Sequence, residues 1–156
     1  MRLHICAVGR LRAGPERDLV DDYLTRFDRT GRAVGLGPAT EHEVEDKRGG
    51  GMAAHAALLE RAIPGGALVC CLDERGRTIS SPDFAALLAG WRDTGRQDVA
   101  FVIGGADGLG PDFRARADAT LSFGQMVWPH MLVRVMLAEQ LYRAAGILAG
   151  TPYHRV

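Results

Sequence analysis

Cysteine is scarce in this chain, and its copies show no regular spacing. The three are Cys6, Cys70 and Cys71. An odd number without a pattern argues against a disulfide framework. Cys70 and Cys71 are neighbours in an apolar run that predicts a strand, so their side chains point to opposite faces. We expect buried, reduced thiols rather than metal ligands.

Metal-binding patterns and long hydrophobic runs are also missing. The five histidines are scattered without zinc-site spacing, so we expect no metal. No apolar run approaches the roughly 18 residues that a membrane-spanning helix needs. Residues 1–9 are too short and too polar for a signal peptide. These absences predict a cytoplasmic protein that makes no membrane contact.

An excess of charge of either sign is lacking as well. Nineteen basic residues balance nineteen acidic ones, so any nucleic-acid site must be a local patch. The chain has 156 residues, of which 47% are hydrophobic and 24% charged. This length and composition suit an ordinary globular protein, and no linker or repeat divides it. We expect one domain spanning residues 1–156.

Strand and helix patterns alternate along the chain, which predicts an α/β fold with a parallel sheet. In the first helix, after Pro15, the spacing of Leu19, Tyr23 and Phe27 predicts a buried face. Ser81 is the expected cap of the third helix. The expected strands cover 2–8, a weaker segment within 33–44, 67–72, 99–103 and 119–122. The expected helices cover 14–31, 52–62, a segment starting at 81, 111–117 and 130–149.

The chain is organised around a glycine-rich loop. The apolar run at 101–103 ends in Gly104-Gly105-Ala106-Asp107-Gly108-Leu109-Gly110, and Pro111 then opens a helix. In open α/β sheets, ligands bind at the carboxyl ends of the strands, where this loop would lie. A turn without a ligand explains the same pattern. A second loop, residues 122–129, follows the next strand and leads into the last helix.

The last helix, 130–149, is apolar around most of its circumference. Such a helix is buried on more than one side, either in a subunit interface or deep within the monomer. Arg134 lies away from its one polar stripe and needs an anionic or carbonyl partner. A structural ion pair and binding of an anionic substrate are the two interpretations.

Few residues are candidates for catalytic groups. Asp73 and Glu74 follow a strand end, where they are either a catalytic pair or simply solvated. No activated nucleophile stands out, which favours chemistry carried by a cofactor. The tail Tyr153-His154-Arg155 combines groups that stack on bases and hold phosphates, although a terminal tail is otherwise often disordered.

Four motifs together resemble the ribosomal large-subunit pseudouridine N3-methyltransferase family of the SPOUT class, known as RlmH. They are Leu72 to Gly76 (LDERG), Ile103 to Leu109 (IGGADGL), Pro129 to Ala144 (PHMLVRV to EQLYRA) and Pro152 to Arg155 (PYHR). The opening Ala7-Val8-Gly9 and the length also match. The glycine-rich segment 30–51 fits the family pattern poorly.

The resemblance implies a parallel-sheet SPOUT fold in which the C-terminal part of each chain forms a trefoil knot, and it implies a homodimer. It implies S-adenosylmethionine as the cofactor, with 23S rRNA in the ribosome as partner. The implied cofactor-binding residues are Leu72, Asp73, Gly105, Gly124, Gln125, Met126, Val127, Trp128 and Pro129. The implied contacts to the substrate RNA are His130, Tyr153, His154 and Arg155.

The implied reaction is methylation of a pseudouridine N3, whose weakly acidic proton must leave before the nitrogen attacks. His154 is the best-matched candidate for the general base, and Arg155 or Arg134 would stabilise the developing anion. Two other interpretations remain: a nucleotide-dependent enzyme that uses the glycine loop for phosphates, and a ribosome-binding or assembly factor without catalysis.

Overall fold

The computed structural model describes residues 1–155, and its strands and helices alternate as expected. The strands are β1 (Arg2–Val8), β2 (Ala39–Val44), β3 (Leu68–Thr78), β4 (Asp98–Ile103) and β5 (Ala119–Ser122). The helices are α1 (Pro15–Gly31), the short 3-10 helix η1 (Arg32–Val34), α2 (Gly51–Ala62), α3 (Ser81–Asp93), α4 (Pro111–Arg116) and α5 (His130–Ala149).

The five strands form one sheet in the order β2-β1-β4-β3-β5. Each neighbouring pair is parallel, as in the register of Ile5 opposite Phe101. The parallel α/β fold predicted from the alternation is therefore confirmed. All five carboxyl ends lie at one edge of the sheet. The trefoil knot stays a prediction.

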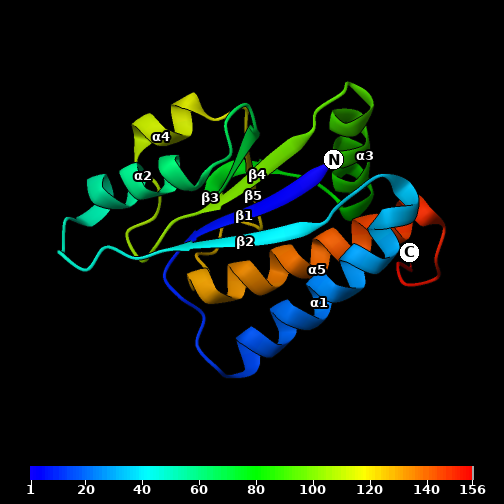
Figure 1. Ribbon diagram of the computed structural model, residues 1–156, viewed down its shortest axis with the longest axis horizontal. Helices are drawn as coiled ribbons and strands as arrows, with labels where there is room; N and C mark the ends of the chain where they lie inside the picture. The colour runs from blue at the N-terminus through cyan, green and yellow to red at the C-terminus, as the bar shows by residue number, and fades with distance from the viewer. Residues whose placement is uncertain (156) are drawn as a thin grey trace.

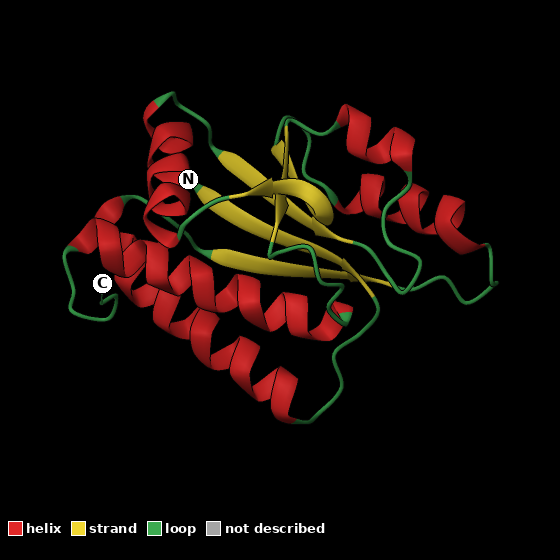
Figure 2. Cartoon of the chain, turned by 180° about the vertical axis from the view of Figure 1, so that it is seen from behind, coloured by secondary structure: helices red, strands yellow, loops and turns green. Residues whose placement is uncertain are grey.

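Helices cover both faces of the sheet (Figures 1 and 2). Helices α1, α3 and α5 pack on one face and α2 and α4 on the other. Cys70 belongs to the core on the first face and Cys71 to the core on the second, and both thiols are free and buried. The predicted opposite orientation of these two side chains is confirmed. Within residues 1–155, none of the helices has the length and apolar character needed to cross a bilayer.

The buried face of α1 is shifted by one residue from the prediction. Val20, Leu24 and Phe27 are buried, whereas Leu19 is 44% exposed and Tyr23 only half-buried. A helical spacing of three or four residues fits both sets, and contact with α5 selects one of them. The prediction for Leu19 was wrong.

The cap of α3 is Ser80 rather than Ser81. The Ser80 hydroxyl accepts a hydrogen bond from the Asp83 backbone N–H at 3.2 Å, whereas Ser81 is already helical and donates to Gln140 at 2.7 Å. A cap hydroxyl reaches the N–H group three residues ahead, and the N–H three residues after Ser81, that of Phe84, already donates to the Ser80 carbonyl at 2.9 Å.

Strand β3 does not end at Leu72 as predicted. It continues to Thr78 through a bulge, because both Leu72 and Arg77 pair with Leu121 of β5. Gly76 allows this return, since a Cβ atom there would lie 2.7 Å from the Leu121 backbone. The bulge places residues 73–76 at the carboxyl edge of the sheet.

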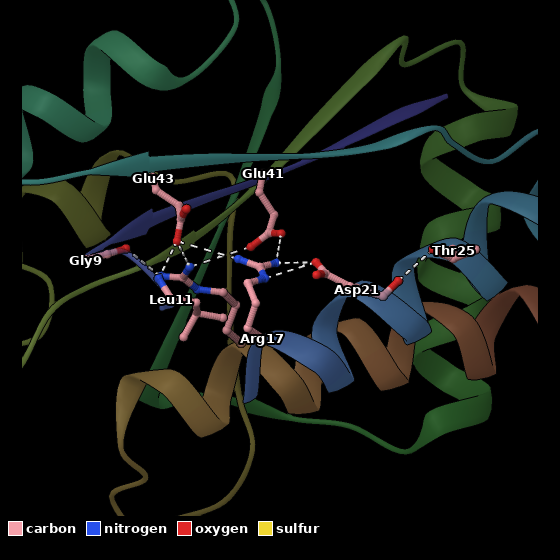
Figure 3. Close-up of polar contacts among 8 residues, drawn as sticks. Gly9, Leu11, Arg17, Asp21, Thr25, Glu41 and Glu43 are labelled. Atoms are coloured by element: carbon pink, nitrogen blue, oxygen red, sulfur yellow. Dashed lines mark hydrogen bonds and ion pairs between the residues drawn. The ribbon is translucent and has the colours of Figure 1, made fainter. Parts of the chain in front are cut away.

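A buried ion network fixes α5 to the sheet and to the loop after β1 (Figure 3). Arg134 of α5 is 1% exposed, and its Nη1 lies 2.5 Å from Glu43 Oε2 of β2. The same Glu43 oxygen accepts the Leu11 backbone N–H at 2.7 Å, and Arg134 Nη2 donates to the Gly9 carbonyl at 2.8 Å. Arg17 of α1 bonds the neighbouring Glu41.

Glu43 is ionised in this network. Its partial burial acts to raise its pKa, but the Leu11 N–H and the Arg134 guanidinium outweigh that effect and hold the pKa below its usual range. One carboxylate thus joins β2, α5 and the β1–α1 loop.

Replacing Glu43 by Gln should destabilise the fold by about 2 kcal/mol, because it leaves the buried Arg134 cation with only the more distant Glu41 carboxylate, 3.6 Å from its Nη1, as counter-ion. Denaturant unfolding measures the loss. The control is Asp21→Asn, which removes an acid of the same network whose side chain is 62% exposed and should cost less than about 1 kcal/mol. Equal losses in the two variants would contradict this interpretation.

A second polar cluster joins the amino ends of β1 and β4. Arg2 donates to both Asp98 oxygens at 2.8 and 2.7 Å, and His4 Nε2 lies 2.8 Å from Asp98 Oδ1. These contacts, that of Arg2 first, lower the pKa of Asp98 to about 2.

Stability should therefore depend on Asp98 in acid. Its folded-state pKa lies below the unfolded value of about 3.9, so the ionised group stabilises the fold above about pH 4 and loses this effect as the pH falls through about 2. Unfolding free energies between pH 5 and pH 2 should fall less steeply in Asp98→Asn than in the unsubstituted chain. Parallel curves would refute the assignment.

Candidate active site

A cavity of about 570 Å³ lies at the carboxyl ends of β3, β4 and β5, beside the first turn of α5. This volume is within the usual range for small-molecule sites. Three segments far apart in the sequence form its walls: the β3 bulge, the glycine loop after β4, and the loop between β5 and α5. Its lining residues are Leu72 to Arg75, Ile103 to Gly108, Leu121, Phe123, Gly124, Met126 to His130 and Val133.

The glycine loop folds back on itself. A Cβ atom at Gly104 would lie 2.6 Å from the carbonyl carbon of Gly108, and the Gly108 N–H donates to the Gly105 carbonyl at 2.9 Å. Gly108 has a φ of +73°, in the left-handed region. Gly105 packs against Val8, whose Cγ1 would lie 3.0 Å from an added Cβ. The tight turn leaves backbone exposed to the cavity.

The β3 bulge is held to this loop by Arg114 of α4. Its Nη1 contacts Asp73 Oδ2 at 3.3 Å and donates to the Leu109 carbonyl at 2.9 Å. The other Asp73 oxygen accepts the Arg75 backbone N–H at 3.0 Å. The Asp73 side chain is only 3% exposed. It therefore holds the cavity wall in shape and is not a free carboxylate.

The third wall is apolar and open to solvent. Met126 is 74% exposed and Val127 78%, and Trp128 follows at 41%. His130 begins α5 half-buried, with Nε2 3.6 Å from the position of a Cβ at Gly9. Burial, and then the Arg134 cation one turn on, lower the pKa of His130, so its imidazole is neutral near pH 7.

The structure brings most of the predicted cofactor residues together. Leu72, Asp73, Gly105, Gly124, Met126, Val127, Trp128 and Pro129 line the cavity, and Gln125 does not. His130, predicted to contact RNA, lines it too.

The predicted RNA-binding tail lies elsewhere in the same chain. It packs on the carboxyl half of α5, where it contacts Glu139 and Arg143. At about 1.5 Å per residue, these two positions lie roughly 14 and 20 Å along the helix axis from His130. The Tyr153 hydroxyl donates to Glu139 at 3.0 Å, and the Arg143 guanidinium lies 4.9 Å from the Tyr153 ring centroid. Glu139 therefore anchors the tail away from its own cavity.

The contact between His154 and Arg143 determines which ring nitrogen of His154 carries the proton in the neutral imidazole. Arg143 Nη1 lies 3.2 Å from His154 Nδ1. A guanidinium only donates, so Nδ1 is the acceptor, and in the neutral ring the proton is on Nε2. In this arrangement His154 presents a hydrogen-bond donor. It becomes a base only if the Arg143 contact breaks.

Arg134 has the surroundings of the structural ion pair, one of the two interpretations open from the sequence. Both terminal nitrogens are engaged, by Glu43 and by the Gly9 carbonyl, and the side chain is almost fully buried. It is not among the residues that line the cavity, although Val133 and His130 on the same helix are. This differs from the direct catalytic role that the resemblance implied.

Several residues that organise the site escaped sequence reasoning. Glu43 holds Arg134, Arg114 holds the bulge, and Glu139 holds the tail. These contacts join residues that are 91, 41 and 14 positions apart in the sequence. No local pattern therefore marks the residues that make them. Within residues 1–155, no cluster of His, Cys, Asp or Glu has the arrangement of a metal site.

Solved structures resemble this fold at low sequence identity. A probable methylase family protein of Haemophilus influenzae matches 99% of this chain and 70% of its own, with a TM-score of 0.54 and 13% identity. A probable methyltransferase of Bordetella pertussis matches 92% of this chain and 96% of its own, with a TM-score of 0.54 and 15% identity. At such identities the likeness concerns the fold.

Sequence relatives are much closer. Proteins of Ruegeria pomeroyi and Ruegeria sp., each called ribosomal RNA large subunit methyltransferase H, are 73% and 72% identical over 100% of both chains. A protein of that name from Roseobacter denitrificans is 74% identical over 99% of each. The family model described as "Predicted SPOUT methyltransferase" matches residues 1–154. The chain therefore belongs to the SPOUT methyltransferase family, among the proteins called ribosomal RNA large subunit methyltransferase H.

Proposed function

We propose that this protein transfers a methyl group from S-adenosylmethionine to N3 of a pseudouridine in 23S rRNA of the assembled large ribosomal subunit. The observation that carries the proposal is the cavity at the carboxyl edge of the sheet, to whose walls three of the four motifs that carry the resemblance contribute. Ribosomes as substrate agree with a neutral chain, since a preassembled particle supplies recognition by shape. Such a substrate also places the protein in the cytoplasm.

The cavity residues suit the cofactor. Leu72, Met126 and Val127 offer apolar surface for a flat ring, and the Gly105 backbone allows close approach. The cofactor, when bound, supplies an electrophilic methyl group on sulfonium. The chain then orients the acceptor, and alignment of nitrogen and methyl carbon supplies much of the rate.

A second copy of the chain completes the site in this proposal. Tyr153 and His154 of the tail contact Glu139 and Arg143, roughly 14 to 20 Å along α5 from His130, and no residue of the tail lines its own cavity. In this proposal the tail therefore serves the cavity of a partner. An exposed apolar segment provides the contact surface. It comprises Met126, Val127, Trp128, Met131 and Leu132, all at least 39% exposed, beside the cavity. We infer a homodimer with two composite sites.

Roles follow from this arrangement. His130 and the partner's tail would face the acceptor nucleotide from two sides. The Nε2–H of His154 and the exposed guanidinium of Arg155 are donors for the oxygens of the developing anion. Once its contact with Arg143 breaks, His154 is also the candidate acceptor of the N3 proton. Arg134 acts at a distance, by holding α5.

The first test is transfer of labelled methyl groups from S-adenosylmethionine to large subunits that lack the modification. We expect the label on N3 of one pseudouridine of 23S rRNA, mapped by nuclease digestion and mass spectrometry. Label on another nucleotide would overturn the specificity. Cofactor binding without transfer to subunits would overturn the substrate, and equal methylation of naked rRNA fragments would overturn the requirement for assembled subunits.

The composite site predicts complementation between two inactive variants. Gly105→Leu should abolish cofactor binding, because its side chain meets Val8 and enters the cavity. His154→Ala should bind cofactor normally and lose transfer. After mixing and subunit exchange, half of the dimers are mixed and carry one intact site of two, which restores about a quarter of the activity.

Two controls accompany that mixture. Gly65→Leu, at an exposed glycine with nothing within 4 Å of an added Cβ, should retain cofactor binding and activity. Thermal unfolding of each variant shows whether it folds. A mixture of folded variants that stays inactive despite proven exchange would refute the shared site.

A further inference from the structure

Four exposed cations gather in two neighbouring loops and make no ion pair within the described residues. Arg10 and Arg12 lie in the loop after β1, and Lys47 and Arg48 in the loop after β2. Many other cations of the chain have an acidic partner, as Arg17, Arg114 and Arg143 do. We call these two segments, residues 10–12 and 47–48, the cationic loops.

The first cationic loop is anchored by its middle residue. Leu11 is only 6% exposed, and its backbone N–H is held by Glu43 at 2.7 Å. Gly9, just before the loop, accepts from Arg134 and donates to the Val44 carbonyl at 2.8 Å. Arg10 and Arg12 therefore extend into solvent on either side of a fixed point.

The second cationic loop is shaped by Asp46. Its carboxylate accepts the backbone N–H groups of Arg48, at 3.0 Å, and Gly50. These two bonds, in that order, lower the pKa of Asp46, so the acid stays ionised and turned towards the backbone. Lys47 and Arg48 stay exposed, and Glu45 is the remaining exposed acid of the turn.

Both loops lie at the carboxyl edge of the sheet, as the cavity does. Figure 1 shows the connections after β1 and β2 leaving the sheet on the side where α5 begins, away from the C-terminal tail. Because Arg134 and Glu43 tie the β1 loop to α5, Arg10 and Arg12 keep a fixed position relative to His130 and the cavity mouth.

We propose that the cationic loops bind backbone phosphates of the rRNA that flanks the methylated nucleotide. The inference rests on the proposed function and adds an explanation of how a chain without net charge binds the negatively charged RNA backbone. Guanidinium groups pair with phosphate oxygens in a two-point geometry, and each contact releases condensed counter-ions. Four cations gathered at the carboxyl edge would set the direction in which the RNA enters the cavity.

The test compares Arg10→Gln/Arg12→Gln/Lys47→Gln/Arg48→Gln with a matched control, Arg29→Gln/Arg96→Gln. The two control cations are exposed, make no ion pair within the described residues, and lie at the amino edge of the sheet. Affinity for large subunits that lack the modification is measured from 50 to 300 mM KCl. Cofactor affinity is measured by calorimetry on the same proteins.

The fourfold variant should bind subunits at least tenfold more weakly at low salt, with cofactor affinity and thermal unfolding unchanged. Its slope of log affinity against log salt should be shallower by about 2 to 3, at roughly 0.7 per lost contact to single-stranded RNA. The control should behave like the unsubstituted chain. Equal slopes in all three proteins, or an equal loss of subunit affinity in the control, would overturn the proposal. Failure of the unsubstituted chain to methylate subunits would instead overturn the proposed function.

Discussion

The arrangement of this protein depends on one buried guanidinium. Arg134 lies under α5 with 1% of its side chain exposed, where an isolated charge would be very costly. Glu43 and the Gly9 carbonyl compensate it. Because these partners belong to β2 and to the loop after β1, satisfying the charge sets where α5 lies on the sheet. The first turn of that helix is in turn a wall of the cavity.

The parallel sheet supplies the second constraint. Every strand ends at the same edge, so loops from distant parts of the chain meet there without any local signal. The β3 bulge, the glycine loop and the β5–α5 loop make the cavity, and Arg114 joins the first two of them. The opposite edge has a structural cluster at Asp98.

The length of α5 links the proposed reaction to assembly. The first turn of α5 borders the cavity, whereas Tyr153 and His154 of the tail contact Glu139 and Arg143, roughly 14 and 20 Å further along the helix. Glu139 and Arg143 fix the tail there through Tyr153, so flexibility does not bring it back. In the proposed homodimer, the tail of one copy would meet the cavity of the other. The exposed apolar segment 126–132 lies where such a contact would begin.

The sequence by itself determined the alternation of strands and helices, the parallel sheet and the loops around the cavity. Apolar periodicity and glycine or proline breaks are local properties, so they are legible in a single chain. The motifs also sufficed to identify the family. Local patterns failed where two solutions were locally equivalent, as with Leu19 against Val20 on α1, or Ser80 against Ser81 as a cap.

Only the tertiary structure decided which partners the polar groups take. The sequence predicted that Arg134 needs an anionic or carbonyl partner. The sequence of its helix does not indicate that Glu43, 91 residues away, is that partner. The β3 bulge likewise depends on the backbone of Leu121, which Gly76 can approach and a larger residue cannot. Burial of charge and close backbone contact are set by groups distant in sequence, and packing alone brings those groups together.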